Sequence, residues 1–169
     1  MPAETLHVAM VQPRLAHHAK ILSIDISEAE RMPGVKKIIL AADIRAAGGT
    51  NIMAEGQMHE RTTVMAPSRE VLNEKKIFRY GDVVALAVAD TKDHARAAAA
   101  KVKVEIEQLP EYLSFLDAVM PDAMRIHEDT PNIFCMQPLL KGAALEDASK
   151  VAEIIDSSAY SAEGSFYSA

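Results

Sequence analysis

The sequence has 169 residues, enough for one domain or for one domain and a piece of another. Its hydrophobic share of 49% and charged share of 25% are ordinary for a soluble globular protein, and its apolar runs are far shorter than a membrane span. The formal net charge of −6 gives no general attraction to nucleic acid or to anionic membranes. The single cysteine, Cys135, excludes an intrachain disulfide and favours a reducing compartment, so we expect a cytoplasmic protein.

Two short strands are predicted at the start of the chain. Leu6–Gln12 is apolar, contains β-branched valines and stops at the following proline. Lys20–Ile26 alternates, which places Leu22, Ile24 and Ile26 on one face and Ser23 and Asp25 on the other. A period of two is typical of a strand with one face in solvent.

A helical turn, a third strand and a long unpatterned loop follow. Ser27 is expected to cap a turn of helix over Glu28–Met32, with Glu30 as its capping-box partner. Val35–Leu40 predicts the strand. The loop Ala47–Glu70 has neither a helical nor a strand period, which is typical of a segment that is functional, mobile or packed against another surface.

The clearest element is a predicted βαβ unit over Val83–Gln108. Its first strand, Val83–Ala89, is a nearly continuous apolar run, and Asp90 or Thr91 is expected to cap the helix that follows. The helix carries a stripe of small residues, and the second strand alternates between apolar and charged positions (Ala95, Ala98, Ala99; Val102, Val104, Ile106). A right-handed crossover would make the two strands parallel, either as neighbours or with one strand between them.

The character of the chain changes after about residue 110. Ser114–Met120 predicts a short helix, and several prolines then predict an extended, irregular path. Leu145–Ile155 has the period of a second helix, and Tyr160–Tyr167 has the pattern of a strand. We therefore expect a domain over residues 1–120 and a different, less regular region over residues 121–169.

The histidines are the obvious candidate metal ligands, but their context favours a structural role. His17 and His18 are adjacent, so on a strand they would point to opposite faces, and no further ligand lies at a suitable spacing. We expect them to be turn or surface histidines. His127, Glu128 and Asp129 lack helical spacing and are expected to form a polar loop with local hydrogen bonds.

The other candidate groups also favour structural roles. Cys135 lies among apolar neighbours, which raise a thiol pKa and make it inert. Gly48-Gly49 lacks the strand–glycine–helix context of a phosphate-binding loop. The acidic pairs are interpreted as solvated charges (Glu105 and Glu107; Asp122 and Glu128). We therefore predict no catalytic, cofactor-binding or metal-binding residue in this chain.

Several stretches, in order and spacing, resemble the α/β hammerhead domain of molybdenum hydroxylases, the aldehyde oxidoreductase and xanthine dehydrogenase family. The resemblance leans toward bacterial aldehyde oxidoreductases and extends over nearly the whole chain except Ala47–Glu70. The matching stretches are L-H-x-A-M-V-Q at Leu6–Gln12, H-H-A-K-I-L-S-I-D-I at His17–Ile26, M-P-G-V at Met32–Val35, A-A-D-I at Ala41–Ile44, Val71–Ala89 with its F-R-Y-G-D-V-V-A-L-A-V-A, A-R-A-A-A-A at Ala95–Ala100, V-K-V-E-I-E-Q-L-P at Val102–Pro110, I-H-E-D-T-P-N-I at Ile126–Ile133, Q-P-L-L-K-G at Gln137–Gly142 and E-G-S-F-Y at Glu163–Tyr167.

The resemblance implies a mixed α/β (α+β) hammerhead domain over residues 1–120, followed by a linker and the truncated start of the molybdopterin-binding region over residues 121–169. It also implies that molybdopterin with molybdenum, and iron–sulfur clusters, are bound by other parts of a larger parent enzyme, which hydroxylates aldehydes or N-heterocycles. This segment alone is then expected to be inactive, and its partners are the other domains or subunits of the parent.

Two other interpretations stay open. The chain could be a freestanding, non-catalytic α/β binding module or small subunit that assembles with a cofactor-bearing partner. An independent small hydrolase using His17, His18 or His127 is the third alternative. If the chain is a fragment, we expect its uncovered apolar residues to favour self-association when it is isolated.

Overall fold

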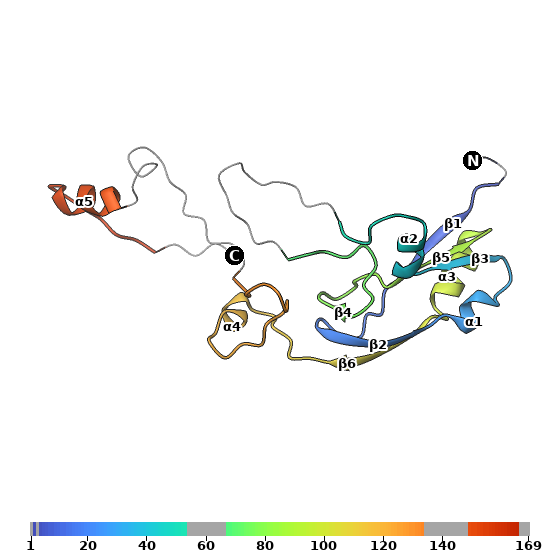
Figure 1. Ribbon diagram of the computed structural model, residues 1–169. Coiled ribbons are helices and arrows are strands. Elements are labelled where there is room, and N and C mark those ends of the chain that lie inside the picture. Colours follow the sequence, from blue (N-terminus) through green and yellow to red (C-terminus); the bar gives the residue numbers. More distant parts are fainter. Residues whose placement is uncertain (1, 3, 54–66, 134–148, 166–169) are drawn as a thin grey trace. The chain divides into compact units, whose positions relative to one another are not determined.

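A computed structural model describes residues 2, 4–53, 67–133 and 149–165 (Figure 1). The chain divides into two units, Met1–Cys135 and Met136–Ala169. The first contains β1 (His7–Val11), β2 (Ala19–Asp25), α1 (Ser27–Glu30), β3 (Val35–Ile39), α2 (Ala41–Ala46), β4 (Lys76–Ile77), β5 (Ala85–Ala89), α3 (Lys92–Ala99), β6 (Lys103–Gln108) and α4 (Phe115–Ala118). The second contains α5 (Ser149–Ser157).

The first unit holds two three-stranded antiparallel sheets, in the orders β1-β5-β3 and β4-β2-β6. The mixed helix-and-sheet class predicted from the sequence is confirmed. The predicted parallel pairing within Val83–Gln108 is wrong, because β5 and β6 lie in different sheets. β1 and β3 occupy both sides of β5, and β6 instead pairs with β2, where Lys20 lies 3.2 Å from Glu107 and Ser23 donates a 2.9 Å hydrogen bond to Glu105. The crossover rule applies only to strands that return to the same sheet.

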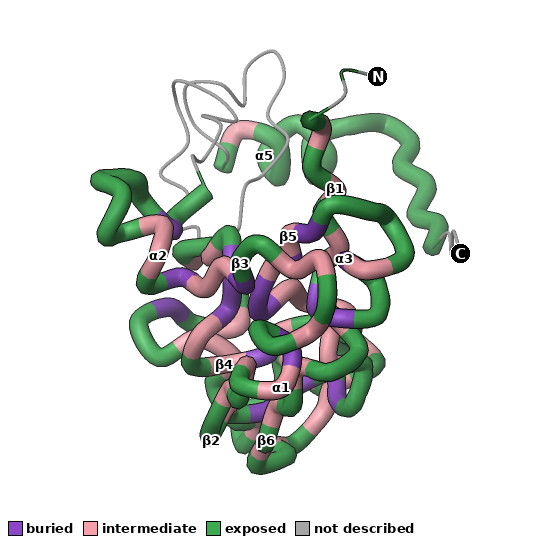
Figure 2. Tube along the Cα trace, turned by 90° about the vertical axis from the view of Figure 1, so that its right-hand side faces the viewer, coloured by how far each residue is buried: buried purple, intermediate pink, exposed green. Residues whose placement is uncertain are grey.

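The helix α3 fixes the core of the first unit. Thr91, one of the two predicted caps, is the N-cap of α3. Its hydroxyl accepts a 3.2 Å hydrogen bond from the His94 amide. Ala95 and Ala98 are buried on the face of α3 that contacts β1 and β5. On β5, the alternate residues Ala85, Ala87 and Ala89 are buried, and Figure 2 shows buried segments, in purple, in the region of β5 and β3. Small side chains on both surfaces let the helix lie close to the sheet.

A β-bulge in β2 changes the predicted face of one residue. The pairing with β6 shifts register between Ile21 and Ser23, so Leu22 has no opposite residue and is 61% exposed. Ile24 and Ile26 pack against the core as predicted, and Ile21 takes the place predicted for Leu22. The extra residue at the bulge shifts by one position which side chains face the core, on one side of the bulge.

The start of α1 also differs from the prediction. Ser27 is the first helical residue, and the N-cap position is occupied by Ile26, which makes no side-chain capping hydrogen bond. The carboxylate of Asp25 instead accepts a 2.9 Å hydrogen bond from the Ser27 amide. Asp25, two residues before Ser27, therefore supplies an acceptor for an amide at the start of α1 that has no partner within the helix.

Side-chain hydrogen bonds join the start of the unpatterned stretch to the residues that follow it. Asn51 is buried; its amide group donates to the Leu72 carbonyl at 2.9 Å and accepts from the Leu72 amide at 3.0 Å. Helix α2, which the sequence pattern did not predict, precedes Asn51 in the chain. Residues 54–66 of the loop, which include the apolar Met58, Val64 and Met65, lie outside the described residues.

The C-terminal elements agree in part with prediction. Ser114 caps α4, its hydroxyl accepting from the Leu116 amide at 3.2 Å. α5 covers the second half of the helix predicted over Leu145–Ile155, whose first half lies outside the described residues. No strand forms in the described part of Tyr160–Tyr167, which ends at Ser165.

Candidate functional site

His17 and His18 precede β2 in a bend and point to different environments. His17 is exposed, and its ring lies 5.1 Å from that of Tyr80. His18 is only 4% exposed; its Nδ1 lies 2.7 Å from the Pro110 carbonyl, while its Nε2 is buried without a hydrogen-bond partner among the described residues. The prediction of opposite orientations holds, but His18 is a core residue and not a surface one.

His127 helps to hold the segment after β6 against the second sheet. Its ring stacks on Phe78 with a centroid distance of 4.5 Å and an interplanar angle of 9°. Beside it, Lys76 Nζ donates a 2.6 Å hydrogen bond to the Ile126 carbonyl. The predicted local hydrogen bonding of this loop includes Thr130, whose hydroxyl lies 3.3 Å from the Asp129 carboxylate.

Burial sets the electrostatics of this region. It lowers the pKa of His18, although the hydrogen bond to the Pro110 carbonyl acts in the opposite direction. Burial likewise lowers the pKa of His127 and of Lys76. With His18 Nε2 sealed from solvent, the polar contacts of His18 and Lys76 and the stacking of His127 join the segment after β6 to the second sheet.

The remaining polar candidates have structural partners or lie outside the described residues. Gly48 and Gly49 donate their amides to the carbonyls of Arg45 and Ile44, both at 3.0 Å, and so end α2. Glu105, Glu107, Asp122 and Glu128 are all exposed, as expected of solvated charges, and the first two also contact Ser23 and Lys20 of β2. Cys135 lies outside the described residues.

Among the described residues there is no group of three or more His, Cys, Asp or Glu side chains placed to hold a metal ion. The expectation that the chain carries no site residue stays a prediction. The surface instead offers two features that sequence reasoning missed, a groove and an apolar lobe.

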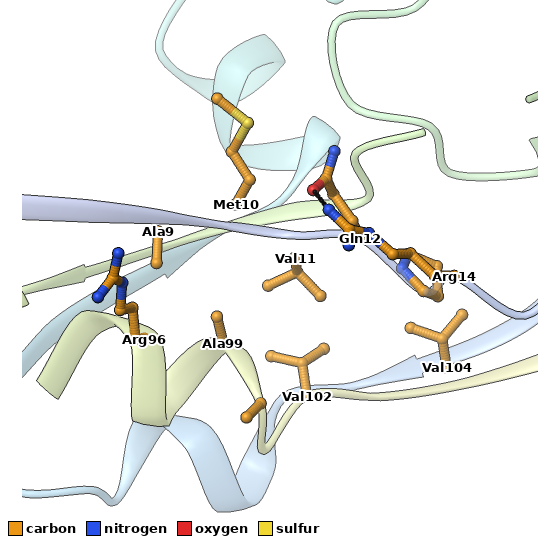
Figure 3. Close-up of a pocket in the computed structure, with 11 residues that line it drawn as sticks. Ala9, Met10, Val11, Gln12, Arg14, Arg96, Ala99, Val102 and Val104 are labelled. Atoms are coloured by element: carbon orange, nitrogen blue, oxygen red, sulfur yellow. Dashed lines mark hydrogen bonds between the residues drawn. The ribbon is translucent and has the colours of Figure 1, made fainter. Parts of the chain in front are cut away.

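The groove has a volume of about 410 Å³ and lies between β1, the end of α3 and β6 (Figure 3). Ala9 and Val11 point from β1 toward Ala99 and Val102, which form its opposite wall (Figure 3). Arg96 and Arg14 lie at opposite ends of the groove (Figure 3). Its chemistry is therefore an apolar floor between two cationic ends.

The apolar lobe is the surface of α4 and the residues beside it. Leu113 and Phe115 are 78% and 76% exposed. Other large apolar side chains of the same short segment are also exposed (Leu116, Val119, Met120, Met124). Polar contacts hold its backbone in place: the Asn132 side chain donates to the carbonyls of Ala118 at 2.7 Å and Met124 at 3.0 Å. An ordered segment that leaves this much apolar surface uncovered is typical of an interaction site.

Comparison with known proteins identifies the domain. Residues 1–110 match the family model described as "Aldehyde oxidase and xanthine dehydrogenase, a/b hammerhead domain". This chain belongs to that family. The resemblance predicted from the sequence is therefore confirmed, and the chain is homologous to a domain of these oxidoreductases.

Individual relatives extend the match beyond the hammerhead region. The aldehyde oxidoreductase of Megalodesulfovibrio gigas is 42% identical over 99% of this chain, and the alignment takes up 17% of that protein. The solved aldehyde oxidoreductase from Desulfovibrio gigas superposes with a TM-score of 0.77 at 41% identity, over 95% of this chain and 16% of the other. A Cu,Mo carbon monoxide dehydrogenase matches with a TM-score of 0.63 at 29% identity, over 85% of this chain and 16% of the other.

The chain thus spans less than a fifth of each relative's length. None of the helices in the described residues is both long and apolar enough to cross a membrane.

Proposed function

We propose that this chain is the hammerhead scaffold domain of a cytoplasmic molybdenum-cofactor-dependent oxidoreductase that hydroxylates aldehydes or N-heterocycles. The observation that carries the proposal is the 42% identity to an aldehyde oxidoreductase along 99% of this chain. The role of the domain is to pack against the cofactor-bearing part of the parent enzyme, with no contact to nucleic acid or membrane.

The apolar lobe supports the packing role. Leu113 and Phe115 lie on a segment whose backbone is fixed by Asn132 and by Tyr112, whose hydroxyl accepts a 2.7 Å hydrogen bond from the Met124 amide. Burying apolar area stabilises an interface by roughly 25 cal/mol per Å². A preformed surface of this kind also loses little conformational entropy on docking.

The residues described do not fit a bound molybdopterin. The amides of Gly48 and Gly49, the only glycine pair in the sequence, are occupied in ending α2 and cannot cradle a phosphate. The unpaired Nε2 of His18 is sealed from solvent. We therefore assign the molybdenum cofactor and the iron–sulfur clusters to other parts of the parent enzyme and derive no catalytic step from this chain.

Reconstitution tests the proposal. The parent enzyme is expressed as two pieces, this chain and the remainder, and aldehyde oxidation is measured with a dye acceptor beside molybdenum content. We expect activity from the mixed pieces and none from this chain alone. Leu113→Asp with Phe115→Asp should weaken assembly, whereas Leu22→Asp, an exposed leucine on β2, is the matched control.

The coding sequence around this segment tests the alternative of a freestanding module. A coding sequence without any cofactor-bearing continuation or neighbouring subunit would contradict the proposal. Assembly that is indifferent to the two lobe substitutions would contradict the assigned packing surface.

A further inference from the structure

The groove lies beside β1, which is an edge strand of its sheet. Six consecutive residues, 9–14, line it. Ala9 and Val11, which alternate along the strand, point into the groove, and residues 12–14 follow the end of β1 (Figure 3). In the described residues β1 has one neighbour, β5, which leaves its other edge unpaired.

The sequence of β1 distinguishes it from the other edge strands. An unpaired edge is a template for another strand, and proteins usually protect it with charged side chains or with a very short strand. β3 carries Lys36 and Lys37, β6 carries alternating charges, and β4 has two residues. β1 reads HVAMV, so among the edges of the two described sheets it alone has no Lys, Arg, Asp or Glu. Its edge is therefore suited to pairing.

The charges at the groove ends specify what would pair there. Arg96 and Arg14 lie at opposite ends of the groove (Figure 3), and both are exposed. Neither forms an ion pair with any described residue; Arg14 donates only a 3.3 Å hydrogen bond to Gln12. Guanidinium groups bind carboxylates through paired, charge-assisted hydrogen bonds. The complementary ligand is extended, apolar in its middle and acidic toward its ends.

We propose that this groove binds an extended acidic peptide segment by strand addition to β1, and that the segment belongs to the part of the parent polypeptide outside this chain. The source rests on the proposed function and on the relatives, in which the matched region is 17% or less of a longer polypeptide. Main-chain hydrogen bonds to β1 supply affinity, and the two arginines select acidic segments.

Peptide binding to the 169-residue chain tests the proposal. Overlapping peptides that tile the rest of the parent sequence are screened by fluorescence anisotropy, and the amide resonances of residues 9–14 are followed by NMR. We expect an acidic, β-prone tile to bind and to shift these resonances. N-methylation of alternate amides in that peptide should abolish binding, because it removes the main-chain donors.

Matched variants separate the charge contribution. Arg96→Gln or Arg14→Gln should weaken binding roughly tenfold, the effect of losing about 1.4 kcal/mol. Arg31→Gln, an exposed arginine away from the groove, should leave binding unchanged. Equal binding of the N-methylated peptide, or equal effects of all three substitutions, would overturn strand addition at this groove.

The same screen tests whether the bound peptide belongs to the parent polypeptide. Binding only by acidic peptides foreign to the parent would overturn the assignment to the same polypeptide, as would the absence of any binding tile. The reconstitution experiment does not depend on the groove. Assembly without a binding tile therefore contradicts this inference alone, whereas a binding tile without active assembly contradicts the proposed function.

Discussion

Replacing two glycines of nearly the same backbone conformation by alanine should destabilise the protein to different extents. Gly34 has φ +78° and Gly48 has φ +79°. An L-residue in this left-handed region costs about 1–2 kcal/mol, and the reduced entropy of the unfolded chain returns about 0.4–1 kcal/mol. A Cβ at Gly48 meets nothing within 4 Å. We therefore expect Gly48→Ala to lower the free energy of unfolding by about 1 kcal/mol.

At Gly34 the added Cβ collides with other atoms as well. It would meet the ring of His94 and the carboxylate of Asp90, which lie 2.6 Å from each other. Forcing either side chain off its rotamer costs about 0.5–1.5 kcal/mol. Gly34→Ala should therefore cost about 2 kcal/mol in total, of which about half comes from the collision.

Urea unfolding followed by circular dichroism measures both variants. The double variant Gly34→Ala/His94→Ala should recover about 1 kcal/mol relative to the sum of the single changes, since the ring is no longer displaced. Equal destabilisation by Gly34→Ala and Gly48→Ala, with no coupling to His94, would refute the collision.

Three further outcomes follow from the same structure. Thr91→Ala removes the α3 cap and should cost about 1 kcal/mol in urea unfolding; an unchanged midpoint would contradict the capping role. Gly81 has a positive φ of +87°, so Gly81→Val should cost about 1–3 kcal/mol, and a neutral substitution would refute the strain. Because burial lowers the pKa of His18 and His127, the unfolded chain binds more protons, so stability is complete above the ordinary value of 6.5 and falls as the pH drops below it. His18→Gln should flatten this pH dependence in unfolding measurements, and an unaltered slope would exclude His18 as its source.

The sequence by itself determined the elements that follow from local patterns of residues. β1, β3 and β6 follow from apolar runs and period-two alternation, and α3 follows from its small-residue stripe after Thr91. The family follows too, because the order of its motifs is a property of the sequence itself.

Only the tertiary structure decided which strands pair. Alternation gives a strand its faces but not its partner, so the sequence could not show that β6 joins β2 and leaves the sheet of β5. The bulge that exposes Leu22 depends on that pairing, and the burial of His18 depends on the carbonyl of Pro110, 92 positions away in the sequence. Asn51 is another such case, since a buried amide is tolerated only where a distant backbone, here that of Leu72, completes its hydrogen bonds. The open edge of β1 has the same origin: it exists because of where β5 and α3 pack, and no local pattern in residues 7–11 could have shown that its other side stays free.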